Sequence, residues 1–131
     1  MDFDKNLKIL FVDDSATIRD MVESSLLQLG YLDIESANDG EEALALAQEE
    51  EYDFIITDIN MPNMDGLELI RRLRDKLYYA SIPIMVLTTE YSDSMKKKGR
   101  EVGATSWIVK PFDTALLDRA IKETINKVIN E

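Results

Sequence analysis

The segment LKILFVDDSA, residues 7–16, indicates the fold class of this chain. From Leu7 to Val12 every residue except Lys8 is apolar, as in a strand of a parallel sheet that is covered on both faces. Two adjacent carboxylates, Asp13 and Asp14, end the run. A core strand does not need two neighbouring negative charges to end, so the pair points to a site at the end of the strand.

Similar short segments recur and alternate with helical patterns. YDFIITD (52–58) and IPIMVLT (82–88) are nearly continuous apolar runs, and DIESA (33–37) and SWIVK (106–110) are shorter. In residues 15–30, before the segment DIESA, apolar residues repeat at helical spacing, with Met21 and Leu26 widening the stripe. Five strands alternating with helices predict a doubly wound five-stranded parallel sheet with right-handed crossovers. The chain has no internal repeat or linker, so we expect a single domain over residues 1–131.

The composition excludes several functions. The chain has no cysteine, which excludes disulfides and thiolate zinc sites, and no histidine, which excludes imidazole metal sites and histidine-based triads. The net charge of −11 argues against nucleic-acid binding. Because no transmembrane run and no secretory signal are present, we expect a cytoplasmic protein without membrane insertion.

Polar side chains stand where four of the five predicted strands end. They are Asp13 and Asp14, Asp58, Thr88, and Lys110. Each has a simpler interpretation alone: an aspartate after a strand forms a turn or caps a helix, Thr88 continues a β-branched strand, and Lys110 is a solvated end residue. Because the carboxyl ends of parallel strands meet at one edge of a sheet, we expect them to form a site. Oxygen ligands without cysteine or histidine favour Mg²⁺, or Mn²⁺ in its place.

Four motifs carry a family resemblance. FVDDS (11–15), ITDINMPNMDGLEL (56–69), VLTTE (86–90) and WIVKPF (107–112) occur in this order at strand ends. They resemble the receiver domains of two-component response regulators, with the greatest likeness to the free-standing chemotaxis (CheY-like) type. The resemblance implies a flavodoxin-like sheet of strand order 2-1-3-4-5, which CheY itself has.

The resemblance also implies a chemistry. Asp58 corresponds to the phosphoacceptor, which takes a phosphoryl group from a sensor histidine kinase or a small phosphodonor. Asp14, Asp58 and the backbone carbonyl of Asn60 are expected to ligate Mg²⁺ directly, and Asp13 largely through water.

Two further residues are expected to act on the phosphoryl group. The ammonium of Lys110 would pair with it, and the hydroxyl of Thr88 would donate to one of its oxygens. The chain is then a phosphoacceptor with intrinsic autophosphorylation and autodephosphorylation only, and not an enzyme.

Signalling in this family involves a conserved aromatic residue on the fifth strand, which turns inward when the threonine moves. Here Trp107 stands where tyrosine or phenylalanine is more usual. The alternative is that Trp107 anchors the core on the side of the fifth helix.

The expected output surface combines the fourth helix, the fifth strand and the fifth helix. Tyr91, Met95 and Val102 form an apolar stripe that Gly99 completes, and we expect Gly99 to permit close approach to the sheet. Lys96, Lys97 and Arg100 give the outer face a basic patch that would steer an acidic partner.

The chain ends soon after its last helical pattern, so we expect output by protein contact, from a monomer. The leading target is a protein such as the flagellar motor switch, with a phosphatase as a further partner. Four alternatives are a shuttle or sink receiver in a phosphorelay, a haloacid-dehalogenase-type phosphatase, a flavodoxin-type electron carrier and a purely structural interaction domain. Asn60 stands where that phosphatase carries a second aspartate, and the two aspartates after the first strand would repel a flavin phosphate.

Two more expectations follow from the resemblance. The Lys110–Pro111 peptide bond should be cis, against a base rate of about 5–6% for such bonds. Asn60 and Glu90 stand at the positions that most influence water's access to the phosphoryl group. Both are polar and of moderate size, so we expect a short-lived phosphoryl group.

Overall fold

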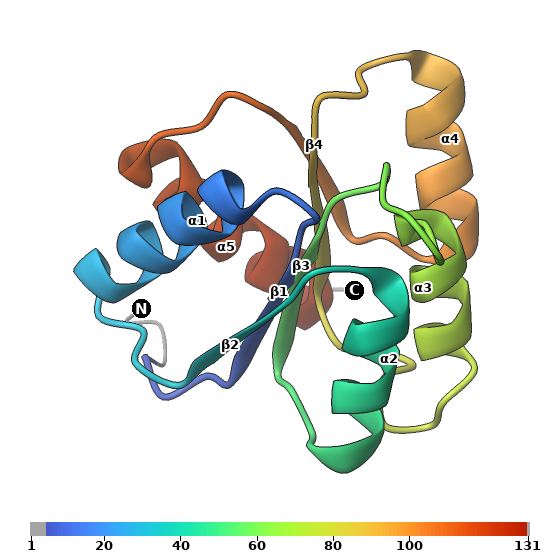
Figure 1. Cartoon of the computed structure of the whole chain (residues 1–131), viewed down its shortest axis with the longest axis horizontal. Coiled ribbons are helices and arrows are strands. Elements are labelled where there is room, and N and C mark those ends of the chain that lie inside the picture. Colours follow the sequence, from blue (N-terminus) through green and yellow to red (C-terminus); the bar gives the residue numbers. More distant parts are fainter. Residues whose placement is uncertain (1–4, 131) are drawn as a thin grey trace.

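The computed structural model describes residues 5–130, and Figure 1 shows their arrangement. Strands and helices alternate along the chain: β1 (Ile9–Val12), α1 (Ala16–Gln28), β2 (Ile34–Ala37), α2 (Gly40–Glu49), β3 (Phe54–Thr57), α3 (Gly66–Arg74), β4 (Ile84–Thr88), α4 (Asp93–Val102), β5 (Ser106–Val109) and α5 (Thr114–Ile129). All strand pairs are parallel, and the sheet order is β2-β1-β3-β4-β5. The predicted fold class and strand order are therefore confirmed.

Two apolar layers hold the helices on the sheet. α1 and α5 cover one face, and α2, α3 and α4 cover the other (Figure 1). In β1, Ile9 and Phe11 pack on the α1–α5 side, whereas Leu10 and Val12 pack on the opposite side. Strands buried on both faces need apolar residues at every position, which explains the continuous runs in the sequence.

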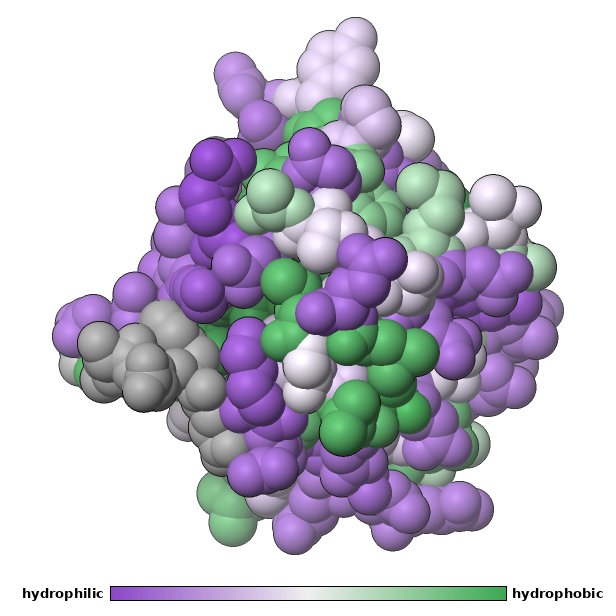
Figure 2. All heavy atoms as spheres, turned by 90° about the vertical axis from the view of Figure 1, so that its left-hand side faces the viewer, coloured by the Kyte–Doolittle hydropathy of each residue, from purple (hydrophilic) through white to green (hydrophobic). Residues whose placement is uncertain are grey.

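The α1–α5 side differs from the sequence prediction at one residue. Met21 was predicted to widen the buried stripe of α1, but it is 44% exposed. Leu27 of the same helix is also exposed, at 45%. Figure 2 shows hydrophobic surface among hydrophilic side chains on this side of the molecule. Val22, Ser25 and Leu26 are the buried residues of α1, so the buried stripe is narrower than predicted.

One prediction for the apolar stripe of α4 was also wrong. Tyr91 was placed on the apolar stripe of this helix, but it precedes the helix and is 75% exposed. The physical reason is a cap: the hydroxyl of Ser92 accepts a hydrogen bond from the backbone N–H of Met95, so the helix begins at Asp93.

Short capped loops join each strand to the next helix. Ser15, Asp39, Asp65, Ser92 and Asp113 are the N-caps of the five helices, and each accepts a hydrogen bond from the N–H three residues later. Because all five strands are parallel, all five strand–helix loops lie at the carboxyl edge of the sheet. None of the helices within residues 5–130 has the length and apolar character needed to cross a membrane.

Candidate functional site

Three carboxylates meet at the carboxyl edge of the sheet. Asp13 and Asp14 follow β1, Asp58 follows the neighbouring strand β3, and one carboxylate oxygen of each lies within 4.8 Å of the others. The parallel register pairs Val12 with Thr57, so the residues that follow these two lie at the same level. Asp13 and Asp58 are buried, whereas Asp14 is exposed. None of the three is a helix N-cap, so the interpretation of these aspartates as caps is wrong, although Asp13 accepts the N–H of Ser15 as a turn-forming aspartate does.

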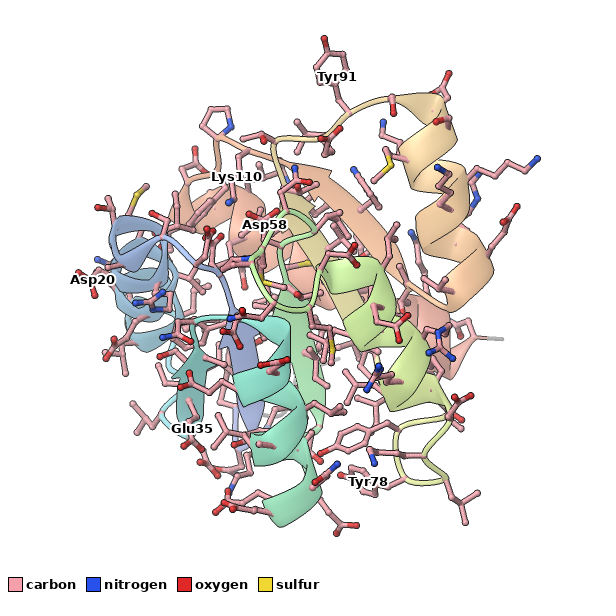
Figure 3. The ribbon with its side chains drawn as sticks, turned by 45° about the vertical axis from the view of Figure 1, so that its right-hand side comes forward. Asp20, Glu35, Asp58, Tyr78, Tyr91 and Lys110 are labelled. Atoms are coloured by element: carbon pink, nitrogen blue, oxygen red, sulfur yellow. The ribbon has the colours of Figure 1, made fainter. Side chains whose placement is uncertain are left out.

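Lys110 joins this cluster from the end of β5. Its Nζ lies 2.7 Å from Oδ2 of Asp13 and 3.1 Å from Oδ2 of Asp58, and Figure 3 shows Lys110 and Asp58 close together at this edge. The Lys110–Pro111 peptide bond is cis, as predicted. Burial lowers the pKa of Lys110, but the hydrogen bonds and charges of Asp13 and Asp58 outweigh it, and the net pKa is raised. Lys110 is therefore a cation at neutral pH.

The donor set fits a hard divalent cation. One ammonium balances only one of the three carboxylates, so the cluster keeps a surplus of two negative charges. Among the described residues, the Asp14 carboxylate has no hydrogen-bond or ion-pair partner, which leaves its oxygens available. Carboxylate oxygens without sulfur or imidazole are the ligands that Mg²⁺ takes in proteins.

The backbone fixes Asp58 in place. Its carbonyl accepts a hydrogen bond from Oγ1 of Thr57 at 2.8 Å, and its Oδ1 accepts one from the N–H of Ile59 at 2.6 Å. A Cβ added to Gly66 would lie 2.1 Å from that carbonyl oxygen, so only glycine permits this approach of α3. The sequence prediction missed this role of Gly66, although a glycine directly after the helix-capping Asp65 was the signal for a close approach.

Besides its contact with Lys110, Asp13 makes hydrogen bonds within the β1–α1 segment that the sequence did not indicate. Its Oδ1 accepts the N–H of Ser15 at 2.9 Å, and its backbone carbonyl accepts a hydrogen bond from Nη1 of Arg19 at 2.6 Å. The short loop between β1 and α1 is thereby held at both of its ends.

Glu90, in the loop after β4, contacts Thr88 at the end of β4 and Asn60 in the loop after β3. Thr88 is buried, and its Oγ1 accepts the N–H of Glu90 at 3.3 Å. Oε1 of Glu90 accepts a hydrogen bond from Nδ2 of Asn60 at 3.0 Å. Among the described contacts, Thr88 therefore bonds the loop rather than the carboxylates.

Trp107 packs against α4 and not on the α5 side. It belongs with the apolar residues of the α2–α3–α4 side, and its Nε1 donates to the backbone carbonyl of Glu90 at 2.9 Å. The alternative in which Trp107 anchors the α5 side of the core is therefore wrong. The cause is its place in β5, whose side chains alternate between the two faces of the sheet.

The residues of the expected output surface lie apart from the cluster. Lys96 and Arg100 of α4 line a hollow of about 200 Å³ with Trp107 and Lys127, and Lys97 is exposed. Tyr91 projects into solvent from the loop before α4 (Figure 3).

A 2-1-3-4-5 sheet with three carboxylates and a lysine at its carboxyl edge defines a flavodoxin-like α/β domain with an acidic pocket. The sequence model of the family described as response regulator receiver domain matches residues 9–122, and the chain belongs to this family. It is thus a signalling protein and not a classical enzyme. Receiver domains bind Mg²⁺ through an acidic pocket, and Asp13, Asp14 and Asp58 form the acidic group here.

Relatives and solved structures agree with this assignment. The chain is 36% identical over 124 residues to chemotaxis protein CheY-3 of Vibrio cholerae, covering 95% of this chain and 92% of the relative. It is 36% identical over 120 residues to the chemotaxis protein CheY homolog of Campylobacter jejuni, covering 91% of this chain and 92% of the relative. The structure of CheY4 of Vibrio cholerae matches with a TM-score of 0.86 and 45% identity, over 91% of this chain and 98% of that one. The solution structure of a response regulator protein from Burkholderia multivorans matches with a TM-score of 0.72 and 47% identity, over 88% of this chain and 91% of that one.

Proposed function

We propose that this chain is a CheY-like response regulator that accepts a phosphoryl group on Asp58 from a sensor histidine kinase or a small phosphodonor. The observation that carries the proposal is the position of Lys110, whose Nζ contacts the carboxylates of Asp13 and Asp58 beside the carboxylate of Asp14. This arrangement puts a nucleophilic carboxylate, a fixed cation and an acidic pocket within a few ångströms. Phosphoryl transfer depends mainly on such positioning and charge neutralisation.

The side chains divide the work of the reaction. A carboxylate oxygen of Asp58 forms a bond to phosphorus, while the bond from phosphorus to the donor breaks and the donor leaves with that electron pair. Lys110 stays protonated and pairs with the phosphoryl oxygens. The hydroxyl of Thr88 exchanges its contact with the N–H of Glu90 for a phosphoryl oxygen. Hydrolysis later returns the carboxylate and inorganic phosphate.

A divalent cation completes this site in the proposal. Asp14, Asp58 and the carbonyl of Asn60 would hold it directly, and Asp13 largely through water. When bound, Mg²⁺ or Mn²⁺ supplies positive charge that offsets the negative charge on the transferring phosphoryl group.

Labelling with acetyl phosphate tests the chemistry. The wild-type chain should gain the mass of one phosphoryl group with Mg²⁺ and none with a chelator, and Asp58→Asn should gain none. Asp20→Asn, on the exposed face of α1, is the matched control and should be labelled like the wild type. Labelling of Asp58→Asn at the same position and rate as the wild type would refute the assignment.

The similarity to named chemotaxis proteins supports a role in chemotaxis, with the flagellar motor switch as the target. In this proposal the chain is a monomeric single domain of residues 1–131 in the cytoplasm, and a phosphatase is a further partner. The surface of α4, β5 and α5, with Tyr91, Lys96, Lys97 and Arg100, is the proposed contact face. A pull-down with and without a phosphate mimic identifies the partner.

Phosphoryl lifetime separates chemotaxis from a phosphorelay. Asn60 and Glu90 are polar and bonded to each other at the edge of the site, so neither seals it against water. After removal of the donor, with Mg²⁺ present, the label should decay within minutes. Persistence for hours would favour a shuttle or sink receiver in a phosphorelay.

A further inference from the structure

Helix α4 approaches β5 through a glycine. Gly99 is the buried residue of α4, and a Cβ added to it would lie 2.6 Å from Cζ3 and 2.9 Å from Cε3 of Trp107. Such distances are too short for real atoms, so the six-membered ring of the indole occupies the place that any side chain at position 99 would need. The position of Trp107 therefore depends on the absence of a side chain at Gly99.

Trp107 in turn holds Glu90. The indole Nε1 donates to the backbone carbonyl of Glu90 at 2.9 Å. The backbone N–H of Glu90 donates to Oγ1 of Thr88 at 3.3 Å, and the Glu90 carboxylate accepts from Nδ2 of Asn60 at 3.0 Å. Glu90 is thus fixed at three points, two in the site and one on the indole. A continuous set of contacts runs from α4 to the loop that follows Asp58.

We infer that Gly99 is a positioning residue of the phosphoacceptor site, acting through Trp107 and Glu90. This inference rests on the proposed function of Asp58. By leaving room for the indole, Gly99 permits the contact to the Glu90 carbonyl, and this contact keeps the Glu90 carboxylate beside Asn60. Residue 99 sets the position of a negative charge at the edge of the site, although it is itself on a helix.

The indole has space to move if residue 99 gains a side chain. The hollow of about 200 Å³ beside Trp107 is lined by the cationic side chains of Lys96, Arg100 and Lys127. A cation over an indole face is attractive, so a displaced Trp107 finds favourable contacts there. The Glu90 carbonyl then loses its indole donor, and its loop is free to carry the carboxylate away from Asn60.

The expected effect is faster labelling by an anionic donor. The Glu90 carboxylate, at the edge of an acidic pocket, repels acetyl phosphate. When this carboxylate moves away, the repulsion from one negative charge is removed. For one partly screened unit charge we expect labelling of Gly99→Ala to be about threefold faster at low salt. The difference should shrink at high salt, because screening weakens the repulsion.

The experiment compares Gly99→Ala with Lys98→Ala, an exposed position on the same helix. Trp107 is the single tryptophan of the chain, so its emission reports the indole directly. The side-chain amide resonance of Asn60 reports its contact with Glu90 without any phosphorylation. Gly99→Ala should shift both signals and speed labelling, and Lys98→Ala should change none of them.

A double-mutant cycle with Trp107→Phe shows whether the effect passes through the indole. Trp107→Phe alone removes the Nε1 donor and should speed labelling as Gly99→Ala does, and Gly99→Ala should then add nothing. A full additional effect of Gly99→Ala in the Trp107→Phe background, or unchanged Asn60 and labelling signals in Gly99→Ala, would overturn the inference. If the wild-type chain takes no label, the proposed function fails, while the emission and Asn60 signals still decide this inference.

Discussion

Replacing Asp14 with asparagine should stabilise the metal-free protein. The Asp14 carboxylate lies near Asp13, Asp58 and Lys110, whose charges sum to −1, and among the described residues it has no bonding partner. At an effective dielectric constant of about 20, one surplus unit charge about 5 Å away costs about 3 kcal/mol. Asp14 is exposed to water, which reduces the expected gain in the free energy of unfolding to about 1 kcal/mol. For a chain of this size that corresponds to about 3–4 °C in Tm.

The assay is thermal unfolding followed by circular dichroism, first with a chelator and then across a Mg²⁺ titration. The wild-type Tm should rise with Mg²⁺, since a cation at ten times its Kd adds about 1.4 kcal/mol to the stability of the folded state. Asp14→Asn should begin at a higher Tm in chelator and lose most of this rise. Asp20→Asn, which projects outward from α1 (Figure 3), should match the wild type in both conditions.

Two outcomes would refute this reasoning. A lower Tm of Asp14→Asn in chelator would mean that the Asp14 carboxylate makes a net favourable contact in the folded state. An undiminished Mg²⁺-dependent rise in Asp14→Asn would mean that the cation binds elsewhere. High salt should reduce the chelator difference between the variant and the wild type, because it screens the repulsion.

Three other predictions concern the fold, and one of them also concerns the site. Arg74→Met should lower the free energy of unfolding by about 2–3 kcal/mol in urea, because the Arg74 guanidinium donates to the carbonyls of Gly103, Tyr79 and Ile82. Gly66→Ala should abolish labelling by acetyl phosphate and lower Tm, because its Cβ would meet the Asp58 carbonyl. Burial, with the charge and hydrogen bond of Asp53, raises the pKa of Tyr78 from 10.0 to about 12. The unfolded chain therefore loses this proton first, and the free energy of unfolding should fall as pH rises from about 10 to 12, less steeply in Tyr78→Phe.

The sheet and the cluster were predictable from sequence because they depend on local patterns and one general rule. Continuous apolar runs gave the central strands, and the meeting of parallel strand ends at one edge placed Asp13, Asp14, Asp58 and Lys110 together. Neither step required knowledge of the loops.

The environment of Trp107 was not predictable in the same way. The four residues of β5 are all half-buried, so the strand has no alternation of buried apolar and exposed polar residues in its sequence. Without that alternation, the sequence does not show which face of the sheet each side chain takes. The sequence placed Gly99 on the buried stripe of α4 but could not show that an indole fills the space beside it. The position of Tyr91 outside α4 was predictable in principle, since Ser92 is a favoured N-cap residue, but the helical spacing of Tyr91 and Met95 placed Tyr91 on the apolar stripe.

The caps explain why the acidic cluster can persist in spite of its repulsion. Ser15, Asp39 and Asp65 each satisfy an N–H group in the first turn of a helix, and apolar strands supply the core, so folding needs little from the Asp14 side chain. Asp13 and Asp58 also have a local structural role, because Asp13 accepts the N–H of Ser15 and Asp58 accepts the N–H of Ile59. Structural and chemical tasks are thus mostly carried by different side chains at the same edge. The surplus charge therefore costs stability without disrupting the loops that position it, and a bound cation would recover that cost.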